Sequence, residues 1–258
     1  MIGAYNTHDF ECKEFSSMEY FWYTSDTIPK GLSFSHFDGF HLAWLLGGAA
    51  VIVVCCLLYR RLDEKQRRIF RKTVAVLLVA DELFKDIPMI AMGVFHVKYL
   101  PFQLCSINLF LIAWHAWRPN RTLSAFLYTV CIPGALAALL FPTWTKLPGM
   151  NFMLIHSFTV HILLLLYPVV LTAGGEISPR LRDVPKCIAL LAALACVALV
   201  LNLVWDTNFM FLMDVTKSNP LYIFEKAWGN HLLGFPVLIA AIVAVMYAPI
   251  EIYHKLKK

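Results

Sequence analysis

The sequence predicts an all-α integral membrane protein, built as a single bundle of about seven transmembrane helices. Of its 258 residues, 59% are hydrophobic and only 15% are charged, and the mean hydropathy is +0.65. A soluble domain is usually about half apolar and a quarter charged. The apolar residues also gather in stretches long enough to cross a bilayer, which takes about 20 residues in a helix. Because backbone groups in lipid must pair internally, and a barrel would need alternating short strands, we expect helices.

Seven apolar stretches are candidate transmembrane helices. They cover residues 40–59, 69–95, 100–117, 123–141, 151–173, 186–205 and 231–253. The second is the most polar and the third is the shortest, so six or eight spans are the alternatives. Residues 1–39 contain no apolar core of the signal-peptide kind, which predicts an extracytoplasmic tail. The expected organisation is therefore this tail followed by one transmembrane domain over residues 40–258.

The positions of Lys and Arg predict the orientation of the bundle. They concentrate around the connections after the first, third and fifth stretches and after the last one. Positive charge favours the cytoplasm, so we expect the N-terminus outside and the C-terminus inside. The strongest block consists of Arg60, Arg61, Lys65, Arg67, Arg68, Arg71 and Lys72. We interpret it as a topology signal, with lipid head-group contact as the alternative, and not as a nucleic-acid-binding surface.

The seven cysteines do not indicate a disulfide framework, because only Cys12 lies in the predicted aqueous tail. A cysteine within a helix is usually a small hydrophobic packing residue. Cys105 differs from the others because polar Gln103, Ser106 and Asn108 surround it in an otherwise apolar segment. It is therefore the first candidate for chemistry.

Polar residues gather in the outer half of the predicted bundle, where their cost in lipid makes them candidate functional groups. Cys105 lies about five residues into the third stretch, roughly 7–8 Å along the helix axis. His156 lies at a similar depth in the fifth stretch. His161 lies roughly 7–8 Å deeper and about 140° around the helix, so the two histidines cannot serve one site equally. The sixth stretch adds Asn202, Asp206 and Asn208.

The second stretch carries a charged cluster of Asp81, Glu82, Lys85 and Asp86. We expect Asp81 and Lys85, four residues apart, to form an ion pair. Glu82 and Asp86 would then repel each other, and one of them could be protonated. The cluster is either a structural ion-pair network or the proton relay of a transporter.

A cysteine nucleophile with a histidine base is the chemistry that best fits these residues. The thiolate is the reactive form, and an imidazole can take the thiol proton. The bundle would protect an acyl thioester from water, and amides such as those of Asn108 or Asn202 could stabilise an oxyanion. A metal site is disfavoured because His156 and His161 are five residues apart rather than four, and no HExxH motif occurs. No soluble cofactor motif is visible, so we expect neither a metal nor a cofactor.

Three stretches resemble the YwaF-like integral membrane family, which has eukaryotic relatives that act as ether-phospholipid acyltransferases. They are LPFQLCSINLF at 100–110, FMLIHSFTVHILLLLYP at 152–168 and LNLVWDTNFMFL at 201–212. The resemblance implies a cysteine acyl-enzyme, with Cys105 as the nucleophile and a histidine of the segment at 152–168 as the base. It favours His161 over His156, because the family pattern has a proline–tyrosine region shortly after its histidine. It also matches Asn202 and Asn208 to family asparagines.

The chain departs from that family before its last helix. The family often has a Gly-Pro-Trp-rich segment there, whereas this chain has EKAWGNHLLGFP at 225–236. The bacterial members are mostly uncharacterised, so the implied activity rests on the eukaryotic relatives.

These observations predict a membrane-embedded acyltransferase or transacylase that moves an acyl chain between phospholipids through a cysteine thioester. Its partners would be phospholipids and lysophospholipids, and its location the bacterial plasma membrane. Substrate or oxyanion contacts are predicted for Gln103, Asn108, Asn202, Asp206 and Asn208. The alternative is a proton-coupled transporter or channel that uses the charged residues of the second stretch. A lipid-binding protein without turnover is a third interpretation.

Overall fold

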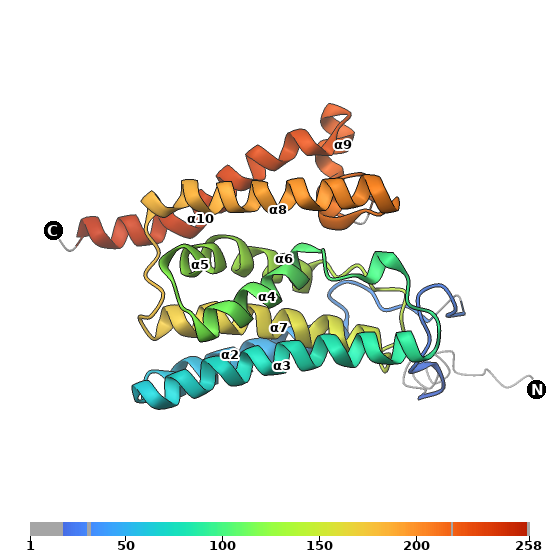
Figure 1. The fold of residues 1–258 in the computed structure, drawn as a ribbon, viewed down its shortest axis with the longest axis horizontal. Coiled ribbons are helices and arrows are strands. Elements are labelled where there is room, and N and C mark those ends of the chain that lie inside the picture. Colours follow the sequence, from blue (N-terminus) through green and yellow to red (C-terminus); the bar gives the residue numbers. More distant parts are fainter. Residues whose placement is uncertain (1–17, 30–31, 218, 257–258) are drawn as a thin grey trace, which may run out of the picture.

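The computed structural model describes residues 18–29, 32–217 and 219–256, and over these residues it is all-helical, as predicted. Figure 1 shows the arrangement. The long helices are α2 Gly39–Tyr59, α3 Glu64–Ala91, α4 Leu104–Trp117, α7 Phe152–Ala173, α8 Val184–Trp205 and α10 Gly234–Leu256. Much of the predicted N-terminal tail, including Cys12, lies outside the described residues.

The predicted fourth span is one helical stretch with a π-helical middle. It consists of α5 Arg121–Phe126, the π segment η3 Leu127–Cys131 and α6 Ile132–Leu140. The remaining elements are short: η1 Met18–Tyr20, η2 Val97–Tyr99, η4 Leu181–Asp183, η5 Phe209–Phe211, α9 Tyr222–Trp228 and η6 His231–Leu233.

Capping side chains explain where two of the helices begin. Asp63 and Gln66 form a capping box, so α3 begins at Glu64, before the apolar run that predicted it. Asn151 caps α7 by accepting a hydrogen bond from the Met153 N–H at 3.0 Å. Its amide also donates to the backbone carbonyls of Tyr20 and Tyr23, at 3.0 and 2.8 Å. These bonds fasten the described N-terminal segment to the start of α7.

Helix α4 begins at Leu104, four residues later than the apolar pattern predicts. Pro101 has no N–H and disfavours helical geometry at the residue before it. The short η2 precedes it, and Gln103 is extended, with φ −67° and ψ 150°. The 14 residues of α4 span about 21 Å, less than the thickness of a hydrocarbon core. Cys105 therefore lies in the first turn of α4, and not in the second turn of a helix that begins at Leu100.

Helix α7 is at the centre of the bundle, packed against α2, α3, α4 and α6. In Figure 1, α8 and α10 form a separate layer beyond α5 and α6. Their outer faces are apolar and exposed, with Leu203 at 68% and Val245 at 73%. Such a surface suits contact with lipid rather than water.

Five helical stretches among the described residues are long and apolar enough to cross a membrane. They are Gly39–Tyr59, Arg121–Leu140, Phe152–Ala173, Leu181–Trp205 and His231–Ile252. Helix α4 is apolar but short, and α3 carries the charged cluster. The protein is therefore a membrane protein with at least these apolar helices.

Candidate functional site

Cys105 and His161 come together between α4 and α7. The thiol of Cys105 and the imidazole of His161 are close enough to interact directly. Both residues are packed among neighbouring helices but retain partial accessibility. Cysteine nucleophilic catalysis requires at least a thiol and an adjacent general base, and an imidazole can serve as that base.

The backbone of α7 orients the His161 ring. Its Nδ1 lies 2.5 Å from the carbonyl oxygen of Ser157, one helical turn earlier. Since a carbonyl oxygen only accepts hydrogen bonds, Nδ1 carries the proton. The other ring nitrogen, Nε2, is then an acceptor in the neutral ring, which is the form that can take a proton from a thiol.

His156 faces α3 and not Cys105. Its Nδ1 lies 3.1 Å from the Asp81 carbonyl oxygen and 3.2 Å from Asp81 Oδ2. Its Nε2 lies 3.5 Å from Glu82 Oε2. The depth count from the sequence had placed His156 level with Cys105, and the late start of α4 explains the difference. His161 lies roughly 13 Å along the axis of α7 from Phe152, and the first turn of α4 meets the helix there.

The expected ion pair between Asp81 and Lys85 does not form. Lys85 Nζ instead lies 2.6 Å from Glu82 Oε1 and 3.3 Å from Asp86 Oδ1, so it separates the two carboxylates that were expected to repel each other. Asp81 turns toward α7, where both its carboxylate oxygens lie 3.0 Å from the Thr159 hydroxyl and share its one proton. The packing of α3 on α7 offers Asp81 these partners, and spacing along one helix could not reveal them.

The charged cluster borders the Cys105–His161 pair. The charge of Asp81 acts on His161, and that of Glu82 acts on Cys105. Glu82 and Lys85 are buried, and Asp81 and Asp86 are partly buried. Among the residues that the structure describes, no group of three or more His, Cys, Asp or Glu side chains has an arrangement that would hold a metal ion.

Asn108 lies one helical turn after Cys105 on α4 and is only 2% exposed. Its Oδ1 has no hydrogen-bond partner in the described part of the chain. Ile112 and His115 continue the same buried stripe. His115 belongs to the other end of the helix, where its ring nitrogens pair with Tyr167 Oη and Ser124 Oγ, both at 2.9 Å.

The predicted polar residues Gln103, Asn202 and Asn208 organise the loop after α8. Gln103 Oε1 accepts from the Met210 N–H at 2.8 Å, which fixes the loop beside the start of α4. Asn202 Oδ1 accepts from the Phe209 N–H at 2.7 Å, and its Nδ2 donates to the Phe209 carbonyl at 3.0 Å. The Asn208 amide bonds to the backbone of 213 and 214.

Asp206 ends α8 in the left-handed conformation, with φ 51°, and its side chain is exposed. Met210 and Phe211 in the same loop also have positive φ values, of 58° and 54°. Backbone of this kind is strained for residues other than glycine, so the side-chain bonds of Gln103 and Asn202 hold the loop in a costly shape. A substrate role for these residues stays a prediction.

A sequence model of the TMEM164 family matches residues 32–247. The chain belongs to the TMEM164 family. The match covers α2 to α9 and most of α10, so the Cys105–His161 pair and the charged cluster of α3 are parts of the TMEM164 region. No curated protein and no solved structure matches the chain. The likeness to YwaF-like proteins stays a prediction beside this membership.

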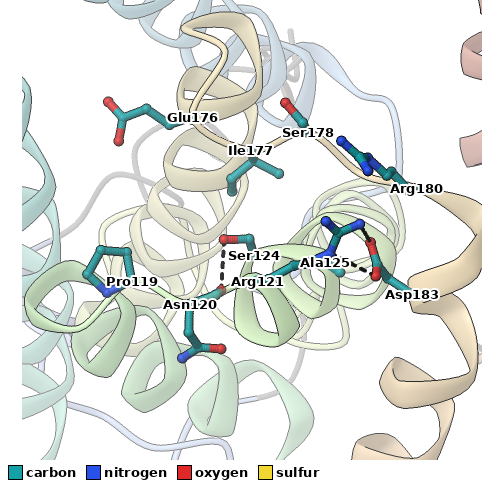
Figure 2. Close-up of a pocket in the computed structure, with 10 residues that line it drawn as sticks. All are labelled: Pro119, Asn120, Arg121, Ser124, Ala125, Glu176, Ile177, Ser178, Arg180 and Asp183. Carbon is teal, nitrogen blue, oxygen red and sulfur yellow. Dashed lines mark hydrogen bonds and ion pairs between the residues drawn. The ribbon is translucent and has the colours of Figure 1, made fainter.

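Sequence reasoning missed two features of this TMEM164-family protein. Thr159 was not singled out, although it is the hydroxyl that engages Asp81. The second is a pocket of ≈350 Å³ at the far end of the bundle, shown in Figure 2. Arginines in the two connections that line it were interpreted only as topology signals. Their spacing along the chain does not show that the folded connections enclose a pocket.

Proposed function

We propose that this protein is a membrane-embedded acyltransferase or transacylase in which Cys105 carries the acyl group as a thioester. The observation that supports it most strongly is the interaction of Cys105 with His161, whose tautomer is set by Ser157. The apolar outer faces of α8 and α10 suit a protein whose substrates are lipids.

In the first half-reaction, His161 Nε2 takes the thiol proton and the Cys105 sulfur attacks the ester carbonyl carbon of a donor phospholipid. A carbon–sulfur bond forms and the ester carbon–oxygen bond breaks. The departing lysophospholipid oxygen takes the proton back from the His161 imidazolium. The nearby carboxylate of Asp81 stabilises that transient positive charge.

In the second half-reaction, His161 takes the hydroxyl proton of an acceptor lysophospholipid. The acceptor oxygen attacks the thioester carbonyl carbon, the carbon–sulfur bond breaks, and the proton returns to the Cys105 sulfur. No net oxidation or reduction occurs, and no co-reactant beyond the two lipids is needed. Water in place of the acceptor would give hydrolysis by the same steps.

The proposed architecture is seven transmembrane spans over residues 40–258, preceded by an extracytoplasmic tail over residues 1–39. Helices α3 and α4 would be the two spans beyond the five apolar ones. An odd number of spans is supported by the positions of η1 and the end of α10, which lie at opposite ends of the bundle in Figure 1. The reactive pair then belongs to the outer half of the bilayer. The bacterial plasma membrane is the proposed location.

Intact-protein mass spectrometry tests the thioester directly. Wild-type protein extracted from membranes should carry an acyl adduct that hydroxylamine removes, and Cys105→Ala should lack it. Cys55→Ala is the matched control, because Cys55 on α2 is also partly buried and packs against the same core. Absence of any adduct on wild type after incubation with phospholipid would count against the enzyme.

Substitution of each histidine in turn distinguishes a general base from a structural residue. His161→Gln should slow adduct formation by about 100-fold or more, because general-base assistance is typically worth 10²–10⁴. His156→Gln should retain most of the rate, because a carboxamide can still hydrogen-bond to Asp81 and Glu82. Equal losses in both variants would contradict the assignment of His161.

A proton-coupled transporter remains a second candidate because ionisable side chains of α3 and α7 form a continuous buried network. His156, Glu82, Lys85 and Asp86 follow one another at ion-pair distances. Proton flux into liposomes, read with a trapped pH dye, distinguishes the two functions. Transport predicts flux that survives Cys105→Ala and is lost in Lys85→Met, whereas the acyltransferase predicts no specific flux.

A further inference from the structure

A polar pocket lies at the end of the bundle far from the start of α4. Its volume is ≈350 Å³, and it is enclosed by the α4–α5 connection and by the chain between α7 and α8 (Figure 2). Polar lining comes from Asn120, Arg121, Ser124, Glu176, Ser178, Arg180 and Asp183. Pro119, at its edge, is 14 residues beyond Cys105, or about 21 Å along a helix. The pocket is therefore separate from the thiol site.

Both carboxylates at this pocket are already engaged by cations. Asp183 accepts two hydrogen bonds from Arg121, from Nε at 3.0 Å and from Nη2 at 2.8 Å. Such a bidentate pair satisfies the guanidinium and the carboxylate together.

Glu176 pairs with residues of α2 and α3. It accepts hydrogen bonds from the Tyr59 hydroxyl and from Arg71, and Arg67 Nη1 lies 3.9 Å away. In Figure 2 its carboxylate points away from Arg180. Both acids therefore have closer partners than Arg180, whose charge acts on Asp183 only from a longer distance.

Arg180 is the remaining cation. Its side chain is exposed, and within the described residues it has no ion-pair partner. The pocket and the residues that pair with it hold two carboxylates against four arginines, namely Arg67, Arg71, Arg121 and Arg180. The excess of positive charge and the nearby Ser178 hydroxyl suit an anion with several acceptor oxygens.

We propose that this pocket binds a phosphate group, either the head-group phosphate of an acidic lipid or that of a soluble compound. Arg180 is its charged ligand, and the hydroxyl of Ser178 supplies a further donor. A neighbouring hollow of ≈430 Å³ offers space for the rest of the ligand; two arginines and one carboxylate residue are among its lining, which consists of Pro179, Arg180, Leu181, Arg182 and Glu251. Basic pockets at helix ends of membrane proteins commonly receive anionic lipid head groups.

Native mass spectrometry of the full chain in detergent tests the site with phosphatidylglycerol and phosphatidylcholine as probes. Wild type should prefer phosphatidylglycerol. Arg180→Gln should weaken that binding roughly tenfold to hundredfold, since a charge-assisted contact is worth about 1.5–3 kcal/mol. Arg68→Gln is the matched control, because it removes one exposed positive charge of the inner basic block without touching the pocket. Arg180→Lys should retain part of the affinity.

Competition with inorganic phosphate at millimolar concentration separates the two sources of the ligand. Displacement of the lipid indicates that a soluble phosphate is enough, whereas persistence of the lipid indicates head-group recognition. Two results would overturn the proposal. One is unchanged phosphatidylglycerol affinity in Arg180→Gln, and the other is an equal loss in Arg68→Gln, which would show only a general effect of charge.

Discussion

Asn108 departs from the rule that buried polar groups are hydrogen-bonded. Its side chain is nearly inaccessible, yet its carbonyl oxygen has no partner in the described chain. An unsatisfied buried group of this kind costs about 1–3 kcal/mol. Because Asn108 lies one turn from Cys105, the cost is understandable if the carboxamide pairs with a reacting lipid.

Asn108→Leu should therefore raise stability while it lowers acyl transfer. We expect a rise in Tm of a few degrees, because removal of an unsatisfied polar group recovers about 1 kcal/mol. Asn202→Leu is the control, since Asn202 is equally buried but bonds to Phe209 and Thr207. That variant should lower Tm. A fall in Tm for Asn108→Leu as well would show that Asn108 is a structural residue.

The partners of single residues could be predicted only in part. The polar surroundings of Cys105 in an apolar segment singled it out, and a histidine of the fifth stretch was a natural partner. The choice between His156 and His161 depended on where α4 begins, which Pro101 and Gln103 determine through backbone geometry. Depth counted from apolar residues alone could not include that shift.

At the scale of elements, helix α2 packs against α7 through a glycine. A Cβ added at Gly48 would lie 2.9 Å from Ile162, whereas one added at Gly47 would meet nothing within 4 Å. Small residues at helix contacts allow close backbone approach in membrane proteins. The two adjacent glycines therefore form a natural matched pair.

Gly48→Leu should separate α2 from α7 and destabilise the bundle by about 1–3 kcal/mol, the usual cost of overpacking. Gly47→Leu points outward and should be nearly neutral. Thermal unfolding of the two detergent-purified variants measures the difference. Equal effects would mean that helix propensity, and not the contact with Ile162, decides the outcome.

The segment before α2 is linked to η2 by an ion pair whose contribution depends on pH. Lys98 Nζ lies 2.9 Å from Asp26 Oδ2, and this hydrogen bond lowers the pKa of Asp26 below its usual value. A lowered carboxyl pKa stabilises the folded state above the unfolded pKa of about 3.9, and this stability is lost as pH falls through the lower folded pKa. The pair is exposed, so its contribution stays below about 1 kcal/mol.

Lys98→Met should therefore reduce stability slightly at pH 7, and this effect should shrink as pH falls below about 3.9. The quantity to measure is the difference in Tm between wild type and variant across that range, which cancels the titration of other groups. A difference that persists at low pH would mean that Lys98 acts through its contact with the Tyr99 ring, 5.1 Å away.

For the whole molecule, the all-helical class followed from hydropathy because lipid leaves few other options for the backbone. The bounds of the predicted stretches agree with those of the helices to within a few residues, because apolar length and capping residues are local properties. The pairing of Asp81 with Thr159, and the pocket around Arg180, depend on which helices pack together. Those contacts join residues far apart in the chain, so local patterns did not reveal them.

The proposed orientation predicts which ends of the bundle a membrane-impermeant maleimide can reach. Ser33 and Ser178 are both exposed but belong to opposite ends of the chain's path through the membrane. In a Cys12→Ser background, Ser33→Cys should be labelled in intact cells, and Ser178→Cys only after permeabilisation. Peptide mass mapping identifies the labelled site. The reverse pattern would place the basic block of residues 60–72 outside, and would require its positive charge to serve lipid binding rather than topology.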